Sequence, residues 1–566
     1  MKKRTLCLIS LLSGLIMALA WFNVMGMGFL MLIAFVPLLF VEDYISRNNS
    51  DKRFVSTYAF VYSLPAFLLY TFPNTWWISN ASPVGYIVPV AEAVFMSAVF
   101  QIYSYSKKVA KNKQGAYFFL VIYWIAFEYL QFTWDINFPW LNLGNSFARC
   151  PALVQWYSVT GIEGGTLWIL LSNILIYFLI VALNKNKTAF KEIKTTFYKN
   201  KTAFHSTDKA VYSDKVKYGI FAALILVIPV TWSLILWYGY EDKAESSVSA
   251  VIVQPNLDPY KEQYNLPPQN VVQRVEDLAA PLMDSNVDFL VLPESCIQEY
   301  AWEDYLDEVP SICELQRFLS LYGNADIIAG MSTRNMLPLG VKTNAAREYP
   351  GLENRYYESC NTAIMFNKKS SLKDIQLRHK SVLVVGVEKM PFTQYFPFIE
   401  NLVLDMGGTV GTLGIDDTVK VFDSGKKHIK IGVPICWESI DGNYCREFIK
   451  KGAGFLQVVT NVGWWGDTPG YKQYFAISRL RAIENRRYVA ICANTGFSGL
   501  VNAKGQEVDK GGYWKRQAFK YDIPLTEDTT FFTRHGDMIM RPFAFIAVLL
   551  LLFSVVRNKT EKNKEK

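Results

Sequence analysis

The chain has 566 residues, of which 51% are hydrophobic and only 19% are charged, and its mean hydropathy is +0.12. This composition excludes a disordered chain, a collagen-like repeat and a small disulfide scaffold, and it is too apolar for an ordinary soluble protein. The net charge of +8 comes from lysines that stand beside apolar runs, so we expect no nucleic-acid partner. The composition therefore predicts a membrane protein with a soluble part.

Eight apolar segments are each about as long as a bilayer-crossing helix. They lie at residues 5–21, 24–41, 54–72, 84–104, 116–132, 165–183, 219–239 and 542–556. If the N-terminus is cytoplasmic, the inner loops hold 24 lysines and arginines, whereas the short outer loops hold only Arg149. Because basic loops stay in the cytoplasm, this asymmetry predicts that residues 240–541 face outward. The first run could alternatively be a cleaved signal peptide, which would leave this orientation unchanged.

Two acidic residues, Glu92 and Glu128, fall within predicted spans. A buried acid in a membrane can mark a substrate or proton pathway, but pairing with a neighbouring helix or an interfacial position is the simpler interpretation.

Between Val248 and about Tyr521, short β-rich runs alternate with amphipathic stretches, which predicts an α/β domain. We expect strands at 248–253, 289–292, 326–329, 363–366, 429–434, 455–460 and 488–492, and helices at 268–284, 309–321, 441–451 and 468–487. The predicted organisation is a bundle of about seven spans over 1–240, an outward α/β domain over 241–535, and a closing span with a basic tail over 536–566.

Three reactive side chains, Glu294, Lys380 and Cys436, stand where predicted strands run into turns, the usual place for a ligand crevice in an α/β sheet. A cysteine attacks as its thiolate and needs a proton acceptor, for which Glu294 is the candidate. The Lys380 ammonium can stabilise a tetrahedral oxyanion and favour the thiolate. The pattern indicates acyl transfer through a Cys436 thioester.

The competing arrangement is a Cys–His pair that uses His379, His205, His428 or His535. We expect no metal and no cofactor, because neither a Cys-x-x-Cys nor a His-x-x-x-His spacing occurs. Six of the eight cysteines fall in the outward segment, where disulfides could form in an unknown pairing. The proposed chemistry requires Cys436 to remain a free thiol.

The order of Glu294, Lys380 and Cys436 in a β-rich domain resembles the nitrilase, or carbon–nitrogen hydrolase, superfamily, whose domain is an αββα sandwich. With its N-terminal bundle and closing span, the whole chain is similar to the bacterial apolipoprotein N-acyltransferase family, with a weaker match at 138–144. The resemblance implies that the glutamate is the general base, the lysine stabilises the tetrahedral intermediate and the cysteine carries the acyl group.

The resemblance also implies supporting roles for Glu388, eight residues after the lysine, and for Trp437 and Glu438 after the cysteine. One departure is that the family often has Asn-Asp where this chain reads Asn461-Val462. The aspartate is therefore missing, while Asn461 follows a predicted strand and could shape the pocket.

The resemblance implies a bacterial inner-membrane enzyme with a periplasmic catalytic domain, expected to be a monomer. A phospholipid would be the acyl donor, and the α-amino group of an S-diacylglyceryl apolipoprotein the acceptor. Membrane anchoring suits such substrates, because extracting a chain costs about 0.8 kcal/mol per CH₂.

Two other functions remain open at this stage: a membrane-tethered nitrilase-type amidase, and a transporter or receptor with an outward binding domain. The aromatic loop 390–399 could dip into the outer leaflet as a lid, or pack on its own domain.

Overall fold

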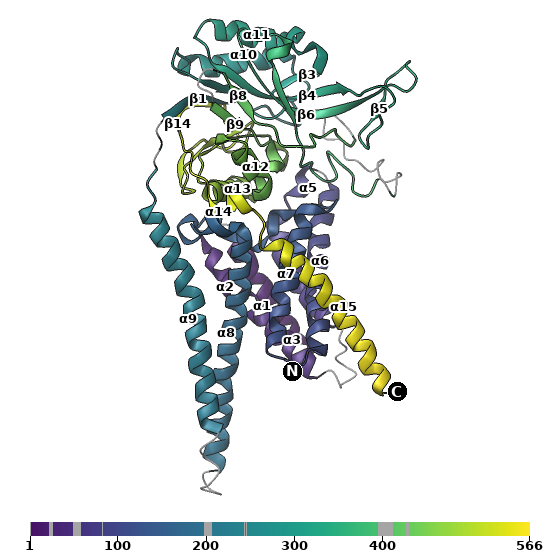
Figure 1. The fold of residues 1–566 in the computed structure, drawn as a ribbon, viewed down its shortest axis with the longest axis vertical. Coiled ribbons are helices and arrows are strands. Elements are labelled where there is room, and N and C mark those ends of the chain that lie inside the picture. The colour runs from purple at the N-terminus through teal and green to yellow at the C-terminus, as the bar shows by residue number, and fades with distance from the viewer. Residues whose placement is uncertain are drawn as a thin grey trace.

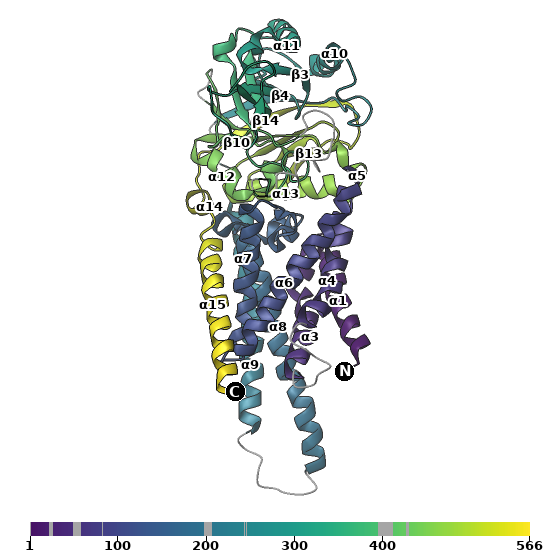
Figure 2. The ribbon, with the colours of Figure 1, turned by 90° about the vertical axis from the view of Figure 1, so that its right-hand side faces the viewer.

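The computed structural model describes residues 2–21, 26–48, 58–81, 83–196, 207–242, 244, 246–393, 395, 411–425 and 429–565. A helical bundle forms one end of the molecule and an α/β part forms the other (Figure 1). Both chain termini lie on the bundle side, away from the α/β part (Figure 2).

Among the described residues, seven helical stretches are long and apolar enough to cross a membrane: Lys3–Trp21, Met27–Arg47, Ile87–Val109, Gly115–Thr133, Tyr157–Asn184, Asp214–Gly239 and Met540–Glu561. They contain α1 (Lys3–Trp21), α2 (Met31–Ala34), α3 (Val36–Arg47), α6 (Ile87–Val109) and α7 (Phe119–Thr133), and lie within α8 (Tyr157–Thr196), α9 (Thr207–Gly239) and α15 (Met540–Glu565). Seven of the eight predicted spans are thus found as apolar helices.

The remaining predicted span, 54–72, overlaps α4 (Tyr58–Thr75), which packs against α1 and α6. This helix contains Pro65 and Pro73, ends in the polar residues Asn74 and Thr75, and is not among the seven stretches above. The short α5 (Ile78–Ala81) follows it. The span count from the sequence is therefore approximate, although the bundle itself is as predicted.

The two glutamates of the predicted spans are paired within the bundle. Glu128 accepts hydrogen bonds from Leu143 N at 2.8 Å and Thr166 Oγ1 at 2.6 Å, and Glu92 accepts one from Gln131 at 2.8 Å. Glu128, on α7, thereby connects α8 with the turn η5 (Leu143–Phe147), which follows the turn η4 (Pro139–Leu141). The simpler interpretation of these acids is thus the one that the structure supports.

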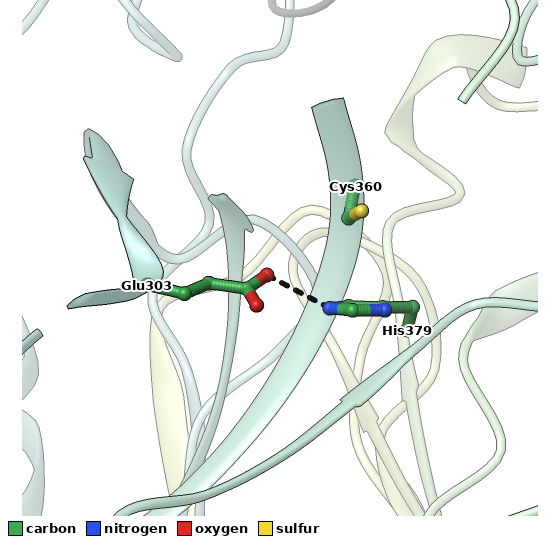
Figure 3. A group of neighbouring side chains, drawn as sticks. All are labelled: Glu303, Cys360 and His379. Carbon is green, nitrogen blue, oxygen red and sulfur yellow. Dashed lines mark hydrogen bonds and ion pairs between the residues drawn. The ribbon is translucent and has the colours of Figure 1, made fainter. Parts of the chain in front are cut away.

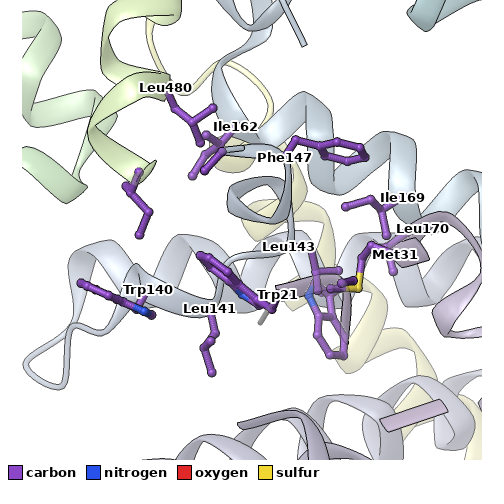
Figure 4. Close-up of a cluster of buried hydrophobic side chains, with 14 of the residues drawn as sticks. Trp21, Met31, Trp140, Leu141, Leu143, Phe147, Ile162, Ile169, Leu170 and Leu480 are labelled. Carbon is purple, nitrogen blue, oxygen red and sulfur yellow. The ribbon is translucent and has the colours of Figure 1, made fainter. Parts of the chain in front are cut away.

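Apolar side chains pack around the same turns (Figure 4). The cluster joins residues from the turns to α1, α2, α8 and one helix of the α/β part, and includes Trp21, Met31, Trp140, Leu143, Phe147, Ile169 and Leu480. The segment that gave the weaker sequence match, 138–144, therefore forms the top of the bundle core.

The described part of the α/β region contains two sheets. The first runs β14-β1-β2-β4-β6-β5, with β3 on β4 and β7 on β6, and the second runs β13-β12-β11-β10-β9-β8. The strands are β1 (Ser246–Gln254), β2 (Phe289–Val291), β3 (Ile297–Trp302), β4 (Asp326–Met336), β5 (Arg347–Glu348), β6 (Tyr356–Asn367), β7 (Gln376–His379), β8 (Phe422–Ser424), β9 (Ile429–Gly432), β10 (Ala453–Thr460), β11 (Val489–Ala493), β12 (Gly499–Val501), β13 (Glu507–Lys510) and β14 (Gln517–Leu525). All seven predicted strands are confirmed. The others are mostly short, exposed or polar, and give little periodic signal.

The sheets pack face to face with helices outside them. Helices α10 (Pro268–Ala279) and α11 (Pro310–Ser320) share an apolar core with the outer face of the first sheet. A second core lies between the sheets and includes Ile252, Ile431 and Val459. Helices α12 (Gly442–Lys450) and α13 (Pro469–Asn485) cover the second sheet. The predicted αββα sandwich and its four helices are confirmed.

Helix α13 connects the sandwich to the bundle. The sequence indicated a helix packed on a sheet, but α13 is buried along nearly its whole length because it also packs on α8. Trp140 Nε1 donates to Gln473 Oε1 at 2.9 Å, and Arg486 donates to Gln155 Oε1 at 2.6 Å. These contacts fix the position of the sandwich on the bundle.

Helix α9 ends at Gly239 before β1 begins, and after β14 the short α14 (Phe531–His535) leads into α15. The domain boundaries at 240 and 535 remain predictions.

Candidate active site

Glu294 and Lys380 meet in the space between the two sheets. Glu294 follows β2, and Lys380 follows β7 and is 1% exposed. Lys380 Nζ lies 3.3 Å from Glu294 Oε1 and 2.8 Å from Glu388 Oε1. Cys436 belongs to the core between the sheets. The charges of Glu294 and Lys380 both shift the pKa of its thiol. The predicted triad is thus brought together from three distant parts of the chain.

The Glu294 carboxylate accepts hydrogen bonds from two segments of the chain, strand β6 and the residue that follows β10. Asn361 Nδ2 donates to Oε1 at 2.8 Å, and Asn461 N donates to Oε2 at 2.9 Å. Strand β4 passes so close that a Cβ added to Gly330 would lie 2.6 Å from the Glu294 Cα, so only glycine fits there. Asn461 therefore touches the candidate base through its backbone, while its side chain bonds Gln263.

Glu388 is the second carboxylate in contact with the Lys380 ammonium. Its carboxylate accepts hydrogen bonds from Lys380 Nζ, from Asn361 Nδ2 at 2.9 Å and from Val384 N at 2.8 Å. Asn361 therefore bridges the Glu294 and Glu388 carboxylates, which the sequence analysis did not predict. An asparagine inside an otherwise ordinary strand carries no local signal of such a role.

Cys436 is the first residue of the short helix η11 (Cys436–Ile440), which follows β9. Its φ is +46°, in the left-handed region that a residue with a side chain seldom adopts. The Cys436 carbonyl accepts hydrogen bonds from Tyr474 OH and Ser439 Oγ, both at 2.9 Å. All eight cysteines of the chain lie in described residues and are free thiols, as the chemistry requires of Cys436.

Burial controls the protonation state of the Cys436 thiol. It raises the thiol pKa to about 12, the Glu294 carboxylate raises it as well, and Lys380 lowers it only in part. Burial by itself would lower the pKa of the Lys380 ammonium, but the carboxylates of Glu294 and Glu388 hold that pKa well above its usual value. The resting site thus contains a thiol and an ammonium. The expectation that Lys380 favours the thiolate is right in direction, but burial outweighs it.

Glu438 is completely buried in an ion pair. Arg378 donates to both of its oxygens at 2.8 Å, and the backbone N–H groups of Ile435 and Ser381 each donate to it at 2.7 Å. These contacts tie the turn before Cys436 to the residue after Lys380. Glu438 therefore positions two members of the triad relative to each other.

Trp437 links the nucleophile turn to the bundle. Its ring stacks on Trp140 with centroids 5.6 Å apart and planes 14° apart, and Phe138 lies on it at 5.8 Å. The residue that follows the candidate nucleophile is thus anchored in the segment at the top of the bundle.

The histidines take other positions. His379 Nε2 lies 2.8 Å from Glu303 Oε1, and its Nδ1 lies 3.3 Å from Asp416. His535 ends α14, while His205 and His428 lie outside the described residues. His379 thus contacts two carboxylates and lies beside Cys360, and the Cys–His alternative stays a prediction.

Comparisons with known proteins agree with this architecture. A family model for the apolipoprotein N-acyltransferase N-terminal domain matches residues 13–175, and the carbon–nitrogen hydrolase model matches residues 250–527. The apolipoprotein N-acyltransferase of Chlorobaculum tepidum is 28% identical over 97% of this chain and 96% of its own length. The apolipoprotein N-acyltransferase of Geobacter metallireducens is 23% identical over 94% of this chain and 92% of its own length. The chain belongs to the apolipoprotein N-acyltransferase family.

Among solved structures, Saccharomyces cerevisiae Nit3, a member of branch 10 of the nitrilase superfamily, is 17% identical, with a TM-score of 0.34. The match covers 50% of this chain and 91% of that one.

In this apolipoprotein N-acyltransferase family member, alkylation of Cys436 should be slow at neutral pH. Because its thiol pKa is raised, the thiolate fraction should grow about tenfold for each pH unit between about pH 7 and pH 9. The rate of modification by iodoacetamide, measured by mass spectrometry of the Cys436 peptide, should follow that rise. Lys380→Met should slow it further, since the ammonium lowers the thiol pKa. A rate that is already constant at pH 7 would mean that the thiolate is preformed.

Two glutamate variants should separate positioning from chemistry. Glu438→Gln leaves the Arg378 charge buried and unpaired, so it should lower the free energy of unfolding by about 3–5 kcal/mol and reduce activity with it.

Glu388→Gln leaves Lys380 paired with Glu294, so it should change the thermal unfolding midpoint little while slowing acyl transfer about 100-fold. Measuring unfolding and turnover together distinguishes them. A Glu438→Gln protein with normal stability and no activity would contradict this assignment.

Proposed function

We propose that this protein is an apolipoprotein N-acyltransferase that completes lipoprotein maturation. It moves an acyl chain from a phospholipid through a Cys436 thioester to the α-amino group of an N-terminal S-diacylglyceryl cysteine. The observation that carries the proposal is the buried Glu294–Lys380 ion pair, whose two charges both act on the Cys436 thiol, in a sandwich fixed to a membrane bundle. Family membership across both parts supports it.

In the first half-reaction, Glu294 removes the proton from the Cys436 thiol, and the sulfur attacks the ester carbonyl carbon of the phospholipid. The Lys380 ammonium stabilises the oxyanion of the tetrahedral intermediate, because the charge lies in a site shielded from water. The intermediate collapses to the thioester as the C–O bond breaks. The lysophospholipid alkoxide leaves with the proton that Glu294 held.

In the second half-reaction, the neutral α-amino group of the lipoprotein attacks the thioester carbonyl carbon. Glu294 accepts a proton from the amine, and Lys380 again stabilises the oxyanion. The C–S bond then breaks, an amide forms, and the Cys436 sulfur regains a proton from Glu294. The two halves use the same three groups, so donor and acceptor occupy the site in turn.

Neighbouring residues hold the three proposed catalytic groups in position. Asn361 and the Asn461 backbone N–H fix the base, and Glu388 fixes the lysine. Glu438 and Trp437 position the nucleophile turn from the sandwich and from the bundle. Since the amidase alternative would use the same triad with water as the acceptor, only the product distinguishes the two reactions. A transporter or receptor would not require the triad.

We further propose that the bundle spans 1–240, that the catalytic domain spans 241–535 on the periplasmic side of the bacterial inner membrane, and that 536–566 closes the chain as a span with a cytoplasmic tail. The 24 basic residues of the inner loops support this orientation. So does the position of both termini on the bundle side, away from the sandwich (Figure 2). We propose that the enzyme acts as a monomer.

The lid over 390–399 stays a prediction, since 394 and 396–399 lie outside the described residues. At its start, Phe392 N donates to Asp135 Oδ2 at 3.1 Å, which joins the loop to the end of the bundle.

Mass spectrometry of the purified protein after exposure to phospholipid tests the reaction. We expect an acyl mass on the Cys436 peptide, absent in Cys436→Ser, and N-acyl peptide on addition of a diacylglyceryl peptide. Cys313→Ser, altered in a cysteine outside the site, is the control and should behave as the wild type. Free fatty acid without N-acyl peptide would favour the amidase, and no acyl-enzyme at all would contradict the proposal.

Labelling of intact cells tests the orientation. A cysteine introduced at Leu321, which is 74% exposed at the end of α11, should react with a membrane-impermeant maleimide. A cysteine introduced at the exposed Asn563 in the tail should react only after the membrane is opened. The reverse pattern would overturn the proposed sidedness.

A further inference from the structure

A second cluster of reactive side chains lies behind the candidate active site, on the other face of the first sheet. Successive residues of a strand point to opposite faces. On β6, Asn361 faces the triad, so Cys360 and Thr362 face away from it. In the register of β6 and β7, Thr362 stands opposite His379, which places His379 on the same rear face.

Three donor atoms converge on this rear face (Figure 3). A carboxylate oxygen of Glu303, Cys360 Sγ and a ring nitrogen of His379 all lie within 4.8 Å of one another. They come from three separate elements, η8 (Glu303–Glu308), β6 and β7. Cys360 and His379 are buried and Glu303 is nearly so, which shields the group from bulk water.

We propose that Glu303, Cys360 and His379 bind a divalent transition-metal ion, with Zn²⁺ as the best match. Thiolate, imidazole and carboxylate are the three protein ligands that zinc prefers, and three of them leave one position for water. Oxygen-binding cations such as Mg²⁺ and Ca²⁺ fit the sulfur and nitrogen donors poorly. This proposal does not depend on the acyl-transfer function.

The surroundings of the cluster orient its ligands as outer groups do in metal sites. Asp416 lies 3.3 Å from His379 Nδ1 and also accepts from the His379 backbone N at 2.8 Å, which leaves Nε2 directed at Glu303. Thr333 Oγ1 donates to Glu303 Oε1 at 2.7 Å. Cys360 Sγ packs against Gly414, where an added Cβ would lie 2.9 Å from the sulfur. A larger residue at 414 would displace the thiol.

Charge balance also favours an ion at this place. Without metal, the carboxylates of Glu303 and Asp416 face the His379 ring and Lys420, which lies 2.7 Å from Asp416. A doubly charged cation bound here would lie beside these two carboxylates, and so would not be an unpaired charge in the interior.

The ion would hold the strands that carry part of the active site. Cys360 precedes Asn361 on β6, and His379 directly precedes Lys380 at the end of β7. A metal that joins these strands to η8 on one face of the sheet would stabilise the candidate active site on the other face. It would take no part in the reaction.

Cobalt titration of the full-length protein in detergent tests the site. The Cys436→Ala background removes the candidate catalytic thiol as a competing ligand. We expect one equivalent of Co²⁺ to bind with a thiolate-to-cobalt absorption band and to be displaced by Zn²⁺. Adding Cys360→Ser should abolish the band. Adding Cys313→Ser, which alters a cysteine of nearby α11, should leave it unchanged.

A second measurement guards against a misfolded variant. Zn²⁺ should raise the thermal unfolding midpoint of the Cys436→Ala protein but not that of its Cys360→Ser derivative, whose midpoint without metal should be nearly normal. Failure of the Cys436→Ala protein to bind Co²⁺, or a thiolate band that survives in Cys360→Ser, would overturn the proposal. In that case the role of the cluster is structural, with His379 held between the carboxylates of Glu303 and Asp416.

Discussion

The candidate active site depends on one buried ammonium group. Lys380 lies in the space between two sheets with 1% of its surface exposed, where an unpaired charge would cost several kcal/mol. Its charge is retained because the carboxylates of Glu294 and Glu388 both contact it. Each carboxylate then needs its own donors, which come from Asn361 and two backbone N–H groups. The polar network of the site follows from the need to satisfy this cation.

The same network explains why the nucleophile can be both buried and reactive. Burial keeps Cys436 as a thiol at rest, which protects it from oxidation and side reactions. In the proposed reaction, the thiolate forms only when Glu294 accepts the proton as a carbonyl group enters. Because the turn at Cys436 is fixed by Glu438 on one side and by Trp437 on the other, the sulfur stays in place while the lipid moves. The bundle thus provides both a membrane anchor and part of the support for the catalytic turn.

Much of this arrangement could be predicted from the sequence. The bundle and most of its spans follow from runs of apolar residues, and the seven main strands follow from short β-rich segments. Glu294, Lys380 and Cys436 could be identified because each stands at a strand end, a position that depends on local sequence. The sequence did not predict the remaining strands, which are held by their neighbours rather than by their own composition. They are the short β3, β5, β7, β8, β12 and β13 and the longer β14.

The family resemblance implied the αββα sandwich. The sequence by itself determined that the protein crosses a membrane, that residues 248–521 form an α/β domain, and which three side chains are candidates for the chemistry. Local composition, spacing and charge distribution suffice for those conclusions. Only the tertiary structure decided that Asn361 bridges two carboxylates, that Glu438 pairs with Arg378, and that burial outweighs Lys380 at the thiol. The structure also separated Lys380 from His379, its neighbour in the chain, onto opposite faces of one sheet. These outcomes depend on contacts between residues far apart in sequence, and on the exclusion of water by packing.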